Sequence, residues 1–505
     1  MTIRTHVSLA LFAVLFASCT AILDFSDPIG DDSEELPDLL EERDDPLQAF
    51  THPDECRACH ETHFDEWEMT PHAYALKDPV FTAMVEMGQR QTMGKLGQFC
   101  VQCHSPTGLA TQQTTVALDP ATQEYKQNLD LDPIGMSGVT CTACHSITNV
   151  IATANAQVVY TPNGIMRGPI ADPVGNVFHP SEYSPLHDDE AEGFGRLCGS
   201  CHNVINPKGA KIERTFDEFE MSSLKAQGET CVSCHMPEYT GKAAVGVDVP
   251  DDLVLPDRTL HRHTFVGVDV SLLPAGEFPG DQTMRDLSEA LLQESTNFTA
   301  SYDESTGRIV TTIENLAGHA IPSGATAERQ MWIEVIVTDG VGATVFRSGT
   351  LDPEGNLRDG IASHTSMPGT DPQLAYFGQV LVAISGFGDM SDAEKTAARA
   401  QIDDDCIPFA QGALVGDSLG VPVDMPWQAD WQCDDLVAPD ATDVRSYDLG
   451  VLATGTYNAQ VRLLFRSFPP HFLSKLEVEG GLDAAVKTRV PTVVMAEQSF
   501  TIGIP

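Results

Sequence analysis

The cysteines of this chain constrain its folding more than any other feature, because ten of the thirteen fall into five copies of one short pattern. Each copy has two cysteines separated by two residues and followed at once by a histidine. The copies are CRACH (56–60), CVQCH (100–104), CTACH (141–145), CGSCH (198–202) and CVSCH (231–235). Such repetition indicates one chemical function performed several times.

The CxxCH pattern is the attachment signature of c-type haem. Two thioether bonds reach the vinyl groups on one edge of the porphyrin, and the adjacent imidazole binds the iron. A zinc site would close with paired CxxC elements and needs no histidine after every second cysteine. A thioredoxin-like dithiol would occur once, near a strand–helix unit. We therefore predict five covalent haems on Cys56, Cys59, Cys100, Cys103, Cys141, Cys144, Cys198, Cys201, Cys231 and Cys234, with His60, His104, His145, His202 and His235 as proximal ligands.

The N-terminal residues predict export. An apolar run from Val7 to Ser18 is too short to cross a bilayer but fits the hydrophobic part of a signal peptide. Its end, LFASC, resembles a bacterial lipobox, which implies a lipid-bearing Cys19 after removal of the signal peptide and, with Thr20 following, an outer-membrane location. Ordinary signal cleavage near Ala17, giving a periplasmic protein, is the alternative.

The charge of the chain restricts its partners. The formal net charge is -44, and the acid-rich residues 20–50 predict a disordered linker between the signal peptide (1–19) and the folded part. Such a chain is not expected to bind nucleic acid or anionic lipid surfaces, so membrane contact would come only through the lipid anchor. Redox-partner proteins are expected to present basic docking patches.

The segment CRACHETHFDEWEMTPHAYA (56–75) resembles the first haem region of multihaem cytochromes of the cytochrome c-554 and hydroxylamine oxidoreductase type. That region reads CxxCH, then an aromatic pair ending in Trp, then Ser-x-His-Ala. Trp67, Thr70 and His72 occupy the corresponding places here. In this family the last histidine is the distal ligand of a different haem, which implies that role for His72. His63, one turn after His60, is expected to pack or to support a ligand.

The resemblance covers residues 51–270 and includes HPSEYSPLH (179–187) and HRHTFVG (261–267). NLAGHAIPSG (315–324) resembles a Gly-His-x-x-Pro-Thr-Gly turn that follows the haem region in this group. It implies five candidate distal ligands, namely His72, His179, His187, His263 and His319. Ligation by two histidines would suit electron transfer, whereas methionine would raise the potential. The methionines, including Met69, Met93 and Met236, are expected to fill the core.

We predict an α+β multidomain fold. A pentahaem domain (51–270) with short helices and loops around the porphyrins is followed by a junction helix (within 271–296) and a β-sandwich-like domain (297–505). The last assignment rests on runs such as RIVTTIEN and AQVRLLFRSF, which alternate apolar and polar residues between turn signals. Cys406 and Cys433 in this domain are predicted to form a disulfide, with two free thiols as the alternative.

The leading functional hypothesis is an electron carrier working between periplasmic or outer-membrane redox partners. One alternative is an oxidoreductase that acts on small nitrogen or sulfur compounds at a haem with an open distal site. Every motif ends in histidine and none in lysine, which removes one mark of nitrite reductases of this group. A subunit of an extracellular cytochrome filament is a further alternative.

Overall fold

The computed structural model describes residues 50–361, 364, 369–405 and 420–505. The predicted signal peptide, nearly all of the acidic linker, and Cys19 and Cys406 lie outside these residues, and so do the predicted lipidation and disulfide. No helix in the described part of the chain is long and apolar enough to span a membrane.

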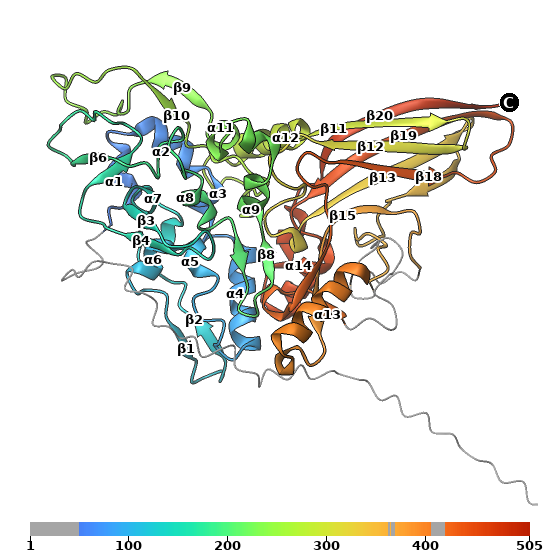
Figure 1. Cartoon of the computed structure of the whole chain (residues 1–505), viewed down its shortest axis with the longest axis horizontal. Helices are drawn as coiled ribbons and strands as arrows, with labels where there is room; N and C mark the ends of the chain where they lie inside the picture. Colours follow the sequence, from blue (N-terminus) through green and yellow to red (C-terminus); the bar gives the residue numbers. More distant parts are fainter. Residues whose placement is uncertain (1–49, 362–363, 365–368, 406–419) are drawn as a thin grey trace, which may run out of the picture.

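Residues 50–270, which we call the N-terminal region, consist of short elements (Figure 1). The helices are α1 (Pro53–Arg57), α2 (Glu61–Glu68), α3 (Pro71–Tyr74), α4 (Pro79–Gln91), α5 (Val101–His104), α6 (Pro106–Ala110), α7 (Cys141–His145), α8 (Arg196–Gly199), α9 (Thr215–Glu220), α10 (Ser223–Ala226) and α11 (Cys231–His235). The paired strands are β1 (Val116–Leu118) with β2 (Tyr125–Gln127), β3 (Ile147–Val150) with β4 (Val158–Tyr160), β5 (Met166–Gly168) with β6 (Ser181–Tyr183), β7 (Val204–Ile205) with β8 (Lys211–Glu213), and β9 (Glu238–Gly241) with β10 (Arg258–His261).

Residues 297–505, the C-terminal region, contain longer strands, and α12 (Asp281–Glu294) precedes them. One sheet has the order β11 (Thr296–Asp303), β12 (Arg308–Asn315), β18 (Thr442–Asp448). The other has the order β16 (Gly420–Val423), β15 (Ala375–Ile384), β13 (Gln330–Asp339), β19 (Gly455–Arg466), β20 (Val493–Ile504), with β14 (Thr344–Ser348) beside β13 and β17 (Trp431–Asp435) beside β15. The α-helices here are α13 (Asp392–Asp405) and α14 (Pro470–Glu479).

The two sheets of the C-terminal region share one hydrophobic core. Phe298 and Ile313 of the smaller sheet are buried in the same cluster as Val335 and Val461 of the larger one. Burial alternates along β12 and β19 because successive side chains of a strand point to opposite faces. The α+β fold with a β-sandwich-like C-terminal part is therefore confirmed.

The two regions meet along a broad contact (Figure 1). Met87 of α4 packs in one cluster with Leu473 and Leu476 of α14. The side chain of Asn206 donates hydrogen bonds to the carbonyls of Pro426 (2.7 Å) and Ala429 (2.8 Å). The C-terminal region thus forms part of the wall of the site described next.

Candidate haem-binding site

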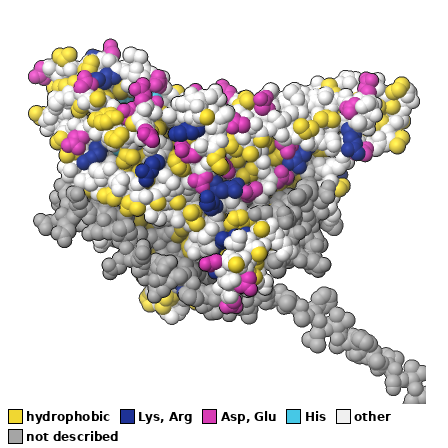
Figure 2. All heavy atoms as spheres, in the orientation of Figure 1, with side chains coloured by type: hydrophobic (Ala, Val, Ile, Leu, Met, Phe, Trp, Pro, Cys, Tyr) yellow, Lys and Arg dark blue, Asp and Glu magenta, His cyan; other side chains and the backbone are white. Residues whose placement is uncertain are grey.

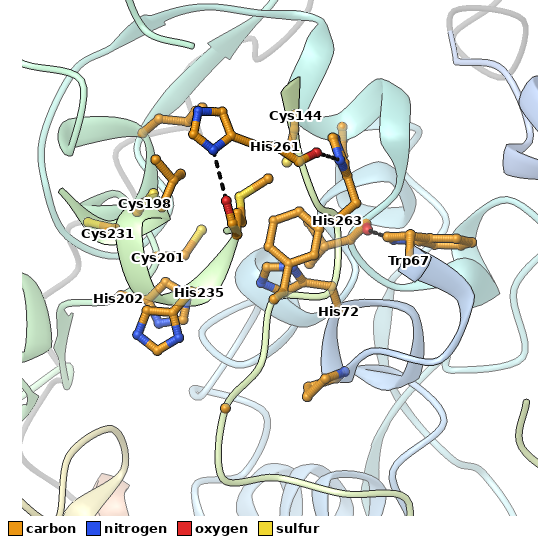
Figure 3. A pocket seen from close by; sticks show the side chains of 18 of the residues that line it. Trp67, His72, Cys144, Cys198, Cys201, His202, Cys231, His235, His261 and His263 are labelled. Atoms are coloured by element: carbon orange, nitrogen blue, oxygen red, sulfur yellow. Dashed lines mark hydrogen bonds between the residues drawn. The ribbon is translucent and has the colours of Figure 1, made fainter. Parts of the chain in front are cut away.

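One cavity of about 1770 Å³ occupies the N-terminal region and is lined by every cysteine and histidine of the five motifs. Seven further histidines also line it, namely His63, His72, His179, His187, His261, His263 and His319. Figure 3 shows part of this cavity, where Cys198, Cys201 and Cys231 lie near His202 and His235. The ligating residue types therefore converge on a single space.

The five motifs take helical turns that turn their reactive groups to one side. The His60 amide donates to the Cys56 carbonyl (2.8 Å), and the His202 amide donates to the Cys198 carbonyl (3.0 Å). In α7 the Thr140 hydroxyl caps the turn by accepting from the Ala143 amide (3.1 Å). Residues three and four apart lie on the same face of a helix, so both sulfurs and the imidazole of a motif face the same way.

Each proximal imidazole is oriented through Nδ1. The acceptors are backbone carbonyls for four of them: Ala243 for His60, Ala75 for His104, Arg167 for His145 and Val266 for His235. His202 differs, because its Nδ1 lies 3.3 Å from a Glu213 carboxylate oxygen. A hydrogen bond at one ring nitrogen sets the tautomer and leaves Nε2 for a metal.

Burial keeps most of these imidazoles neutral, which is the form that binds metal. Burial lowers the pKa of His72 to about 3 and that of His319 to about 4, and it also lowers the pKa of His60, His104 and His235. For His202, burial is outweighed by the Glu213 carboxylate, which raises the pKa to about 9. This proximal ligand is therefore more electron-rich than the other four.

Four proximal rings face a second imidazole at a distance that fits one iron between them. With a metal–nitrogen bond of about 2.0–2.1 Å, two imidazoles on opposite sides of one ion have ring centres roughly 6.4 Å apart. The observed pairs are His60 with His179 (6.0 Å), His202 with His72 (6.3 Å), His145 with His263 (6.3 Å) and His235 with His319 (6.3 Å). The residues present therefore fit covalently bound haem iron.

Nδ1 of His179, His263 and His319 also contacts a backbone carbonyl, at Pro180, His261 and Ala320 respectively. These contacts leave Nε2 available, as at the proximal side. His319 comes from the loop after β12, so the C-terminal region contributes one imidazole of the His235–His319 pair.

Two other histidines are near proximal rings but are engaged differently. His63 lies 6.3 Å from His60, yet its Nε2 is hydrogen-bonded to the Tyr239 hydroxyl (2.9 Å). His187 lies 5.3 Å from His145, and its Nε2 donates to the Cys144 carbonyl (3.1 Å). His145 therefore has two neighbouring imidazoles. Of the two, His263 lies at the larger distance from His145 (6.3 Å), which is the spacing expected for two ligands of one iron.

His104 has a different surrounding. Its ring stacks on Phe81 with ring centres 3.9 Å apart, and no imidazole of the described residues makes a ring contact with it. The half-buried carboxyl of Asp78 and the buried carboxyl of Glu328 line the same cavity. Burial raises the pKa of Asp78 to about 7 and that of Glu328 to about 8. Glu328 is near this motif, since burial and the Glu328 charge together raise the pKa of Cys100 to about 12.

Sulfurs of different motifs lie close together. Those of Cys56 and Cys141, of Cys103 and Cys201, and of Cys198 and Cys231 are near enough to shift each other's pKa. Each pair joins two different motifs. His72, which follows the first motif, faces His202 of the fourth. All five motifs therefore form one connected set.

Some parts of this site could not be found from the sequence. Glu213, Phe81 and Glu328 carry no motif, and they reach the cavity only because the chain folds back on itself. Glu213 ends the short strand β8, whose Ile212 packs against Leu381 of the C-terminal region. A carboxylate next to a buried apolar residue is too common a pattern to predict such a contact.

The fold, the repeated attachment motifs and the paired imidazoles define a multihaem c-type cytochrome with an appended C-terminal β domain, as predicted. Residues 55–146 match the family model described as cytochrome c554 and c-prime. Among solved structures, the chain is similar to a penta-haem cytochrome c552 from Thermochromatium tepidum. That similarity has a TM-score of 0.54 and 20% sequence identity, and it covers 91% of this chain and 100% of the other. No curated protein matches the chain.

Proposed function

We propose that this protein carries electrons through five covalently bound haems, most of them with two histidine ligands. The observation that supports this proposal is the closeness of sulfurs that belong to different motifs. In each pair the two sulfurs would hold different porphyrins, so their closeness brings the edges of neighbouring porphyrins together. A connected set of redox groups is what transfer along the molecule requires.

The chain's own residues prepare these sites. Bound haem supplies reversible one-electron chemistry, with a potential set by the axial ligands, hydrogen bonds and burial. The backbone carbonyls at Nδ1 hold the proximal rings, and Trp67 supports the segment of His72 by donating to the Val139 carbonyl (2.9 Å, Figure 3). Fixed ligands on both sides of an iron change little between oxidation states, which favours fast transfer.

We also propose that the protein is exported and meets its donor and acceptor outside the cytoplasm, through a basic docking patch on the partner. The acidic composition supports this choice. On the face drawn in Figure 2, acidic and basic side chains are intermixed. The partner would therefore be attracted by the net negative charge of the protein and not by one concentrated acidic patch. Attachment to the outer membrane through Cys19 belongs to the same proposal.

The haem content and the spin states of the irons test this proposal. We expect mass spectrometry of the mature protein to find five added haems and electron paramagnetic resonance to find mostly low-spin iron. His263→Ala should convert one low-spin iron to high spin without loss of haem. His187→Ala is the matched control and should leave the spin count unchanged, because its Nε2 already bonds to a carbonyl. Haem-free mature protein would refute the proposal. A changed number of low-spin irons in His187→Ala would assign the distal ligand to His187 instead of His263.

A second candidate function is an oxidoreductase acting on small nitrogen or sulfur compounds, and the surroundings of His104 favour it. This ring packs on Phe81 instead of facing an imidazole among the described residues. Asp78 and Glu328 line the same cavity with pKa values of about 7 and about 8, so both can hold or release a proton near neutral pH. Proton delivery by such groups is the usual contribution of a protein to this chemistry.

Adding hydroxylamine or nitrite to the purified holoprotein separates the two functions. An enzyme should show a high-spin signal that the added compound perturbs, together with turnover. In that case Glu328→Gln should lower turnover while the haem count stays the same. An electron carrier should show neither perturbation nor turnover.

A further inference from the structure

Three ligating side chains converge at the rim of the cavity, outside the haem-ligand set. They are Asp189, Glu238 and His261, whose ligand atoms all lie within 4.8 Å of one another. Nε2 of His261 is 3.5 Å from Oδ1 of Asp189. Neither the sequence motifs nor the proposed electron transfer gives these three residues a role.

The β9–β10 hairpin places two of the three groups side by side. The antiparallel register pairs His261 directly with Glu238. Side chains directly opposite each other in such a ladder have Cβ atoms about 4.5–5.5 Å apart and point to the same face. The hairpin therefore presents an imidazole and a carboxylate together at its end.

Asp189 comes from a separate segment, the turn that follows His187. Asp188 holds this turn, since its carboxylate accepts from the Glu190 amide (3.1 Å) and from the Tyr183 hydroxyl (2.7 Å). The Asp189 and His261 side chains are only 26% and 16% exposed. Two segments far apart in sequence thus meet through two partly buried polar groups, beside the exposed Glu238.

The orientation of His261 is the observation that points to a ligand. Its Nδ1 donates to the Met236 carbonyl (2.8 Å), an interaction drawn in Figure 3. Metal-binding histidines almost always donate their second ring nitrogen in this way, which directs the lone pair of Nε2 at the ion. Here Nε2 faces a carboxylate oxygen at 3.5 Å, a spacing that a cation bound by both atoms would give.

The donor set indicates the class of the cation. One imidazole nitrogen and two carboxylates suit Zn²⁺ and similar divalent transition metals, with a water molecule completing the site. Ca²⁺ and Mg²⁺ prefer oxygen ligands alone. Two carboxylates also balance a charge of two.

We propose that Asp189, Glu238 and His261 bind a divalent transition-metal ion of the Zn²⁺ class, which ties the β9–β10 hairpin to the turn after His187. The ion would clamp two segments that carry haem-ligand candidates. His263 lies two residues after His261, and His187 lies two residues before Asp189. The site stands apart from the proposed electron transfer, because none of its three ligands is a haem ligand in that proposal.

Zinc titration of the metal-stripped holoprotein tests the site. We expect one tightly bound Zn²⁺ per chain by isothermal calorimetry and elemental analysis, with the haem iron as internal reference. Asp189→Asn, Glu238→Gln and His261→Gln should each weaken binding at least tenfold. Asp172→Asn is the matched control, because it removes one carboxylate that pairs with Arg258 of the same hairpin (2.7 Å) away from the three ligands. It should bind Zn²⁺ like the unaltered protein.

The haem absorption spectrum shows whether each variant is folded. X-ray absorption at the zinc edge of the unaltered protein gives a second, variant-free measurement, with one imidazole and otherwise oxygen ligands expected. Binding that all three variants retain, millimolar binding only, or a zinc environment without imidazole would each overturn the proposal.

Discussion

The N-terminal and C-terminal regions of the molecule differ in what stabilises their folds. The C-terminal region is built from strands of up to twelve residues, such as β19 and β20, around one large cluster of apolar side chains. The motif helices of the N-terminal region have only four or five residues, and its apolar clusters are small. Isolated helices of that length are not stable in water. The comparison teaches that one region carries its own core, whereas the other must complete its core with the cofactor.

The largest expected effect comes from withholding haem. If the chain is produced without haem attachment, we expect residues 50–270 to lose their protection against hydrogen exchange, because the cavity of about 1770 Å³ has no other filling. Amides of β13 and β19 should stay protected, since their core is made of their own side chains. Mass-spectrometric hydrogen exchange measures both regions, with the holoprotein as control. Equal protection in the two regions without haem would contradict the comparison.

A pH-dependent stability is expected for the C-terminal region. His364 is buried, and its Nδ1 lies 2.7 Å from Asp359 while its Nε2 lies 3.7 Å from Asp424, which also pairs with Lys475. His471 stacks on the same ring (3.8 Å). Burial opposes the charged form, but the hydrogen bond to Asp359 and the ion pair with Asp424 outweigh it and raise the pKa of His364 to about 9.

Because the folded state keeps this proton and the unfolded state releases it near pH 6.5, the stabilisation is complete below pH 6.5 and is lost as pH rises toward 9. The free energy of unfolding should fall by about 1.4 kcal/mol per pH unit in this window. His364→Gln should reduce the slope by about this amount. Urea midpoints from far-ultraviolet circular dichroism test this, with haem absorbance reporting the other region. An unchanged slope in the variant would assign the effect elsewhere.

The smallest expected effect lies where the regions meet. Glu213→Gln should raise the reduction potential of the haem held by His202, because the carboxylate at Nδ1 stabilises the oxidised iron. A tenfold change in relative affinity corresponds to about 59 mV for one electron. Glu220→Gln is the matched control. It removes the same charge from a nearby segment, where the Glu220 carboxylate pairs with Lys225 (3.1 Å). Spectroelectrochemical titration should show no comparable shift in the control, and equal shifts would mean a general field effect.

Much of this architecture could be read from local patterns. The spacing of Cys141, Cys144 and His145 identifies a haem attachment site because both thioethers and the imidazole must serve one porphyrin. The alternation along RIVTTIEN predicts a strand because one face of a sheet is buried. The pairing of His145 with His263 rather than His187 could not be read in this way, because both candidates lie many residues away and only their distances and hydrogen bonds distinguish them.

By itself, the sequence determined the chemistry of each attachment site and the change from short haem-binding elements to long strands, because both depend on residues that are neighbours along the chain. Only the tertiary structure decided which imidazoles face each other. It also placed the Glu213 carboxylate beside Nδ1 of His202, and Asp189 beside the β9–β10 hairpin. These contacts join residues between 11 and 130 positions apart, and packing of the whole chain sets them. No local pattern encodes such distances.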